Sequence, residues 1–199
     1  MIHRLKTLFI GAALVTPSLA FAHSPIKGIN NFYNGVLHPA LVPPQLMLLI
    51  AMGLYLGQRD VSQNQKPVMS FLVAAIAGLV VAGFSSGFEL QVLMLGTTIV
   101  VGILVAADLA LKRHWRIAMV ALAGLLLGLD STQETLSGMP KWVTLFGCLI
   151  GIALLLMFPM ALADYCRSKE WQRIGVRVIG SWLVAAAVMV VAFLVVAPI

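Results

Sequence analysis

Charged residues are scarce in this chain of 199 residues. Asp, Glu, Lys and Arg together make up 10% of it and only 7 residues are acidic, whereas 61% are hydrophobic. A soluble domain is usually about half apolar and about a quarter charged. The shortage of polar surface therefore excludes a water-soluble globular domain. Together with a mean hydropathy of +1.01, it predicts an all-α, polytopic membrane protein whose main partner is the lipid bilayer.

The few acidic residues are outnumbered by 13 Lys and Arg, which gives a net charge of +6. These basic residues fall in short segments between apolar runs and do not gather in one patch. This distribution is typical of a membrane protein, and we expect no nucleic-acid partner.

Cysteine is also rare. Cys148 lies inside an apolar run and Cys166 lies at the basic end of the same run. Eighteen residues of helix separate two positions by about 27 Å, whereas a disulfide needs Cα atoms within about 7 Å. A disulfide framework is excluded, and both cysteines are predicted to be packing residues.

The first 22 residues form a separate unit. "MIHRLK" is a basic start, "TLFIGAALV" is an apolar centre, and "TPSLAFA" ends in small residues. This order predicts a secretory signal peptide over residues 1–22, cleaved before His23. Residues 23–199 are then a single helical transmembrane domain. An uncleaved first helix is the alternative.

Six apolar runs follow the signal peptide and predict about six transmembrane helices. They cover roughly residues 41–57, 68–84, 90–111, 116–130, 143–163 and 174–197. Nine basic residues lie in three alternate connections, and only two lie in the others. The positive-inside rule places the nine in the cytoplasm. We therefore expect a multi-pass protein of the bacterial inner membrane with both mature termini periplasmic. The nine are Arg59, Lys66, Lys112, Arg113, Arg116, Arg167, Lys169, Arg173 and Arg177.

The six runs divide into residues 23–113 and 114–199, which would be 3+3 inverted halves of the kind found in transporters. Two runs are interrupted at corresponding places. The first is entered through "HPALVPPQ", and the fourth, which is short, leads into "GLDSTQETLSGMP". Because both interruptions open toward the outer side, their polar groups are expected to meet.

His38 leads into a predicted span, whereas His23 is terminal in the mature chain and His114 lies among basic residues predicted to be cytoplasmic. An imidazole at a membrane interface can bind a metal, relay a proton or cap a helix. Pro39 directly after it suits the first turn of a helix. The residues alone leave these roles open.

Carboxylates are few enough to consider singly. Asp130 and Glu134 are four residues apart, hence on one face if the segment is helical. They offer oxygen ligands for a divalent cation or hydrogen bonds to a polar solute, and an ordinary solvated loop is the alternative. Asp108 precedes Lys112 by four and is expected to pair with it at the cytoplasmic interface.

One motif suggests an enzyme. "GFSSG", residues 83–87, matches the G-x-S-x-G of serine hydrolases, which would make the protein an intramembrane hydrolase. That motif requires a strand-to-helix turn, which an all-helical protein does not supply. We expect a protein that is not an enzyme.

Layout and spacing along most of the chain resemble the HupE/UreJ family of hydrogenase and urease accessory membrane proteins. The resemblance rests on the signal ending before His23, "HP" ahead of the first span, "LLIAMGLYLG" within it, and "LMLGTTIVVGILVA" after Glu89. It implies a small helical permease for nickel or cobalt. No permanently bound cofactor is implied, and Ni²⁺ or Co²⁺ would be the cargo.

The resemblance also implies a ligand set. The family's first-span signature is H-x5-D-H, and "HPALVPPQ" keeps His38 but has Pro44 and Gln45 at the last two positions. The fourth-span signature, H-G-x-A-x-G-x-E, aligns with "LGLDSTQE", which keeps Gly128 and Glu134. The predicted metal ligands are His38, Gln45, Asp130, Glu134 and His23.

The leading expectation is a secondary permease for a divalent transition metal or another small solute. No phosphate-binding loop for a nucleotide is present. The alternative is a non-transporting accessory or scaffold protein of the same fold. A homo-oligomer is compatible with either.

Overall fold

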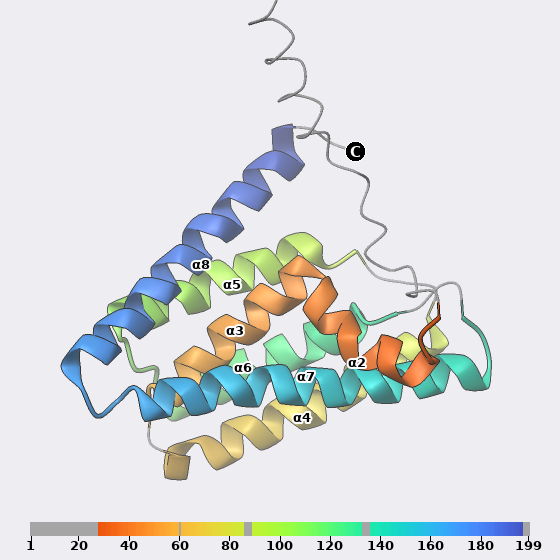
Figure 1. Ribbon diagram of the computed structural model, residues 1–199, viewed down its shortest axis with the longest axis horizontal. Helices are drawn as coiled ribbons and strands as arrows, with labels where there is room; N and C mark the ends of the chain where they lie inside the picture. Colours follow the sequence, from red (N-terminus) through yellow and green to blue (C-terminus); the bar gives the residue numbers. More distant parts are fainter. Residues whose placement is uncertain (1–27, 60, 86–88, 133–135, 197–199) are drawn as a thin grey trace, which may run out of the picture.

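The computed structural model describes residues 28–59, 61–85, 89–132 and 136–196, and every regular element in them is an α-helix (Figure 1). This confirms the predicted all-α class. The described helices are α2 (Asn31–Leu41), α3 (Pro43–Gly57), α4 (Val61–Phe84), α5 (Gln91–Ala107), α6 (Arg113–Leu129), α7 (Met139–Tyr165) and α8 (Glu170–Val196). The predicted signal peptide and its cleavage site lie outside the described residues.

All six predicted apolar runs coincide with helices, α3 to α8, whereas α2 falls outside them. By length and composition, α4, α7 and α8 can each cross a membrane, and α2 with α3 makes a fourth if the bent pair is one span. Helix α5 is apolar but shorter. The count of six crossings stays a prediction.

A sharp break separates α2 from α3, which meet at an angle of 73°. Val42, between them, has an extended backbone (φ −95°, ψ 103°) because a residue that precedes proline is kept out of the helical region. Pro43 and Pro44 then occupy the first helical positions of α3, where no backbone donor is needed. The predicted bent entrance is therefore present. The prediction for Pro39 was wrong: α2 begins at Asn31, and Pro39 lies near its end.

Glycine pairs spaced four apart let three helix pairs approach backbone to backbone. Gly124 and Gly128 of α6 face α4, Gly147 and Gly151 of α7 face α2, and Gly53 and Gly57 of α3 face α7. At each of these positions an added Cβ would collide with backbone atoms of the neighbouring helix. Close approach of this kind compensates for the weak hydrophobic drive between helices in lipid.

The helices form two groups that differ from the two halves of the sequence. Helices α4 and α6 pack mainly on each other, and only sparsely on the rest. In the other group, α7 and α5 pack against α3, α2 packs mainly against α7, and α8 packs mainly against α5. We call these the α4–α6 pair and the α3 group. Figure 1 shows α8 running obliquely along α5 and projecting away from the other helices at its C-terminal end. The inverted 3+3 arrangement stays a prediction.

The basic segments gather at one end of the molecule, as predicted. There the Arg59 Nη1 donates to Asp108 Oδ1 (2.9 Å), Arg167 donates to the Arg59 carbonyl (3.3 Å), and Arg116 donates to the Gln63 carbonyl (3.3 Å). We call this the arginine end. At the opposite end, Lys141 donates to the carbonyl of Ser85 (3.0 Å).

The predicted pairing of Asp108 with Lys112 was wrong. Helix α5 stops at Ala107, and Asp108 caps it in the left-handed conformation (φ 54°). The helical four-residue spacing therefore does not extend to Lys112. The Asp108 carboxylate instead receives hydrogen bonds from Arg59 (2.9 Å) and Arg173 (3.2 Å).

Candidate solute site between α3 and α6

The centre of the candidate site is a buried hydrogen bond between two elements that are far apart in the sequence. Gln45 lies in the first turn of α3 and is fully buried. Its Nε2 donates to Asp130 Oδ2 at 2.8 Å and to the Asp130 carbonyl at 3.4 Å. Asp130 caps the C-terminus of α6 and is 8% exposed. The prediction that these two residues lie together is confirmed, while their role as ligands stays a prediction.

This bond fixes the orientation of the Gln45 amide. A carboxylate accepts hydrogen bonds, so the amide NH₂ faces Asp130 and Oε1 faces elsewhere. Oε1 is buried, and no donor within the described part of the chain reaches it. A buried acceptor without a donor is costly. The site therefore offers an unused oxygen beside a carboxylate.

Ser131 and Thr132, which directly follow Asp130, are also buried. The hydroxyl of Ser131 donates to the carbonyl of Leu127 (2.7 Å), and that of Thr132 donates to the carbonyl of Leu129 (3.0 Å). These bonds satisfy carbonyls that the end of α6 leaves without helical partners. The segment is therefore not a solvated loop in its described part.

Cys148 borders the same region. It packs in a small apolar cluster with Leu79, Ala82 and Leu145, as expected of a packing residue. Its side chain also lies close to that of Ser131. Sequence analysis missed this contact, because α7 and the end of α6 are brought together only by tertiary packing.

His38 lies on α2 and is 5% exposed. Gly35, one turn earlier, packs against the α7 backbone at Thr144 and Cys148. A chain of contacts thus leads from the His38 helix through Cys148 and Ser131 to Asp130. The side chain of His38 is not an exposed interface group, which leaves a functional role open to it.

The other two predicted ligands, His23 and Glu134, lie outside the described residues. Within the described ranges, no three His, Cys, Asp or Glu side chains are grouped closely enough to hold a metal ion.

The serine of the hydrolase-like motif has a different setting from a hydrolase nucleophile. Ser85 directly follows the end of helix α4, whereas the nucleophile of that motif sits on a turn from strand to helix. Gly83 packs on the ring of Trp142. Ser86 and Gly87 lie outside the described residues.

Fold and site together define a helical membrane protein with buried polar groups at a broken span. The model of the family described as HupE / UreJ protein matches residues 11–190, so the chain belongs to the HupE/UreJ family. This family is associated with nickel or cobalt uptake or with accessory roles. Comparisons with curated proteins and with solved structures give no match.

Proposed function

We propose that this protein is a secondary permease that carries a divalent transition metal, nickel or cobalt, or another small polar solute. The observation that carries the proposal is the buried hydrogen bond between Gln45 and Asp130. Polar and ionisable groups inside membrane proteins are costly, and they mark solute or ion pathways. Membership of the HupE/UreJ family supports the same substrate class.

The chemistry of the pair suits a cation that passes through. The Asp130 carboxylate supplies charge, and the unused Oε1 of Gln45 supplies a neutral oxygen. Nickel and cobalt also bind imidazole, which His38 would add. A set with one carboxylate, one amide and one imidazole binds weakly enough to release its cargo.

The packing suggests how access would alternate. The Gln45–Asp130 bond joins the α3 group to the α4–α6 pair, and these two groups share few other contacts. Movement of one sequence half against the other would break the tight α4–α6 and α5–α8 interfaces. We infer that the α4–α6 pair moves as a unit against the α3 group, so that solute binding at Asp130 and movement are coupled.

A non-transporting accessory role is the second candidate. The observation in its favour is that two positions of the family's ligand signatures hold Pro44 and Leu127, which have no ligating side-chain atoms. In that case the buried pair would be a structural bond between α3 and α6. Transport assays on the variants below separate the two roles.

Asp130→Asn and His38→Ala should each lower the initial rate of Ni²⁺ or Co²⁺ uptake by at least about ten-fold, because each removes a favoured ligand. Uptake of radiolabelled metal into proteoliposomes measures this. Glu89→Gln is the control, since it removes one negative charge from an exposed residue ahead of α5. Uptake that is absent in the wild type would favour the accessory role. Uptake that is present and unchanged by Asp130→Asn and His38→Ala would reject the proposed site.

The arginine end should face the cytoplasm, because the positive-inside rule retains basic connections there. In a Cys166→Ser background, Lys66→Cys should react with a membrane-impermeant maleimide only after cells are permeabilised. Met139→Cys, which replaces a 76% exposed residue at the other end, should react in intact cells. The reverse labelling pattern would show that the orientation is wrong.

A further inference from the structure

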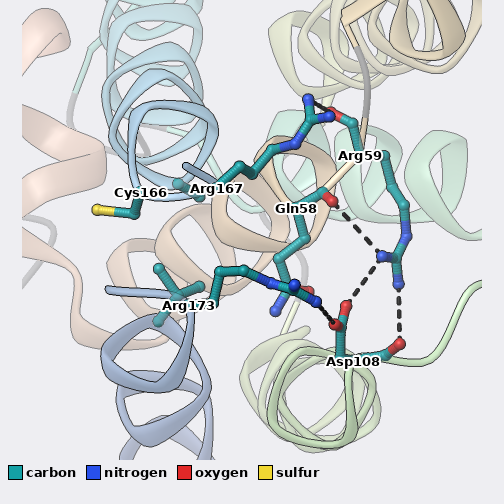
Figure 2. Close-up of a pocket in the computed structure, with 8 residues that line it drawn as sticks. Gln58, Arg59, Asp108, Cys166, Arg167 and Arg173 are labelled. Atoms are coloured by element: carbon teal, nitrogen blue, oxygen red, sulfur yellow. Dashed lines mark hydrogen bonds and ion pairs between the residues drawn. The ribbon is translucent and has the colours of Figure 1, made fainter. Parts of the chain in front are cut away.

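A pocket of about 280 Å³ opens at the arginine end, where α3, α5 and α7 stop and α8 begins. It is lined by Gln58, Arg59, Asp108, Ala163, Cys166, Arg167, Arg173 and Val176. Figure 2 shows Arg167, from the connection between α7 and α8, reaching toward Arg59, and Arg173, from α8, reaching toward Asp108. The pocket lies at the opposite end of α3 from Gln45, so it is separate from the candidate solute site.

Arg59 is largely committed to Asp108. Its Nη1 donates to the carboxylate (2.9 Å) and its Nη2 donates to the backbone carbonyl (3.1 Å) of the same residue. Burial raises the pKa of Asp108, but hydrogen bonds from Arg59 and Arg173 outweigh it and hold the pKa below its ordinary value. The stabilising pairs are therefore complete at neutral pH, and are lost only as the pH falls through that lowered pKa.

Arg167 and Arg173 keep most of their donors. A guanidinium carries five N–H donors. In the described part of the chain, Arg173 uses only Nη2, toward Asp108. Arg167 uses only Nη1, toward Asp164 and the Arg59 carbonyl. The Arg167 side chain is 40% exposed and the Arg173 side chain is 57% exposed, so the unused edges are accessible.

The local charge is positive. Three guanidinium groups, of Arg59, Arg167 and Arg173, stand against the two carboxylates of Asp108 and Asp164, which leaves one positive charge in excess. The C-terminal ends of α3, α5 and α7 add partial negative charge. Arg177 offsets part of this, because its Nε donates to the carbonyl of Ala106 near the end of α5 (2.8 Å).

Two exposed tryptophans at this end favour a position at the level of lipid head groups. Trp115, near the start of α6, is 63% exposed, and Trp171, near the start of α8, is 69% exposed. Tryptophan is enriched at membrane–water interfaces. A phosphate at this level is within reach whether it belongs to a lipid or is dissolved in water.

We propose that the pocket binds a phosphate group through the unused guanidinium edges of Arg167 and Arg173. Arginine forms paired, charge-assisted hydrogen bonds to phosphate. Basic pockets between membrane helices on the cytoplasmic side bind anionic head groups in the same way. A bound phosphate would tie the connection after α7, which carries Arg167, to the first turn of α8, which carries Arg173.

Thermal unfolding of the delipidated, detergent-purified protein tests this with three probes: phosphatidylglycerol, phosphatidylcholine and inorganic phosphate matched in ionic strength with chloride. Phosphatidylglycerol should raise the melting temperature, and Arg167→Gln with Arg173→Gln should raise its half-saturating concentration at least about ten-fold. Lys66→Gln with Arg113→Gln is the control. It removes two positive charges from exposed residues at the start of α4 and α6 and should respond like the wild type.

The outcomes separate the sources of phosphate. A rise with phosphatidylglycerol alone identifies a lipid, and a rise with inorganic phosphate as well shows that the free anion suffices. The proposal would be overturned if neither phosphatidylglycerol nor inorganic phosphate raised the melting temperature, or if phosphatidylcholine raised it equally. It would also be overturned if the control pair lost as much affinity for phosphatidylglycerol as the glutamine pair. If the glutamine pair does not fold, Arg167→Lys with Arg173→Lys decides. It keeps the positive charge but loses the paired N–H donors of the guanidinium group. An affinity unchanged from the wild type would therefore overturn the proposal, and a weaker affinity would support it.

Discussion

Gly128→Ala should destabilise the protein by about 1–3 kcal/mol, the usual cost of adding a methyl group to a filled interior. The new Cβ would lie 2.8 Å from the Leu79 nitrogen and 2.9 Å from the Gly78 Cα, and would collide with the Ala75 carbonyl. These are backbone atoms of α4, which cannot rotate away as a side chain can. Relief requires separating α4 from α6, whose other contacts with the molecule are sparse.

The melting temperature of the purified protein measures this effect, with size-exclusion chromatography used to monitor loss of the folded protein on heating. Gly96→Ala is the matched control, because the same Cβ on α5 would meet no heavy atom of the described chain within 4 Å. Alanine is the better helix former by about 1 kcal/mol, so the control should be unchanged or slightly more stable. Equal melting temperatures for the two variants would show that the α4–α6 approach is not tight.

The helices could be predicted from sequence because the bilayer allows few alternatives. A backbone in lipid must satisfy its polar groups internally, so long apolar runs become helices. The break at Val42 was predictable for a similarly local reason, since Pro43 and Pro44 fix the backbone around them. Helix α2 lies outside the apolar runs, and hydropathy gave no sign of it.

The site was partly predictable because topology places the ends of helices. Gln45 lies at the start of a run predicted to descend from one side, and Asp130 lies at the end of a run predicted to return to it, so their meeting followed from the predicted order of spans. The approach of Cys148 to Ser131 had no such signal. It depends on how α7 is rotated and packed, which hydropathy does not specify.

The sequence does contain a pattern that indicates helix packing, although it lies within the apolar runs and does not affect their hydropathy. Gly53 and Gly57, Gly124 and Gly128, and Gly147 and Gly151 are all G-x-x-x-G pairs, and each faces another helix. This spacing places two small residues on one helix face. It identifies which faces are packed, although not against which partner.

Asp108 shows where local rules fail. A four-residue spacing predicts a pair only while the helix continues, and the left-handed Asp108 ends α5 first. Its partners Arg59 and Arg173 are remote in sequence. The pocket at the arginine end was therefore not foreseeable from spacing, although the gathering of basic residues at one end was.

Pro44→Asp combined with Gln45→His should tighten Ni²⁺ binding at least about ten-fold, which corresponds to about 1.4 kcal/mol. The double substitution restores the carboxylate and the second imidazole of the family's first-span signature, and nickel favours imidazole. Position 45 already contacts Asp130, so a histidine there lies beside a second carboxylate. Position 44 is buried at the start of α3, where a negative charge is favoured by the helix dipole.

The bend between α2 and α3 should survive this change, because Pro43 still occupies the first position of α3 and keeps Val42 extended. Isothermal titration of the purified protein with Ni²⁺ measures the affinity. Pro43→Asp with Gln45→His is the control. It has the same composition but places the acid at an exposed position and removes the proline that keeps Val42 extended, so it should gain less. An Ni²⁺ affinity that Pro44→Asp with Gln45→His leaves unchanged, or that the control raises equally, would show that the start of α3 does not face a metal path. The accessory role would then be the better explanation of the buried Gln45–Asp130 bond.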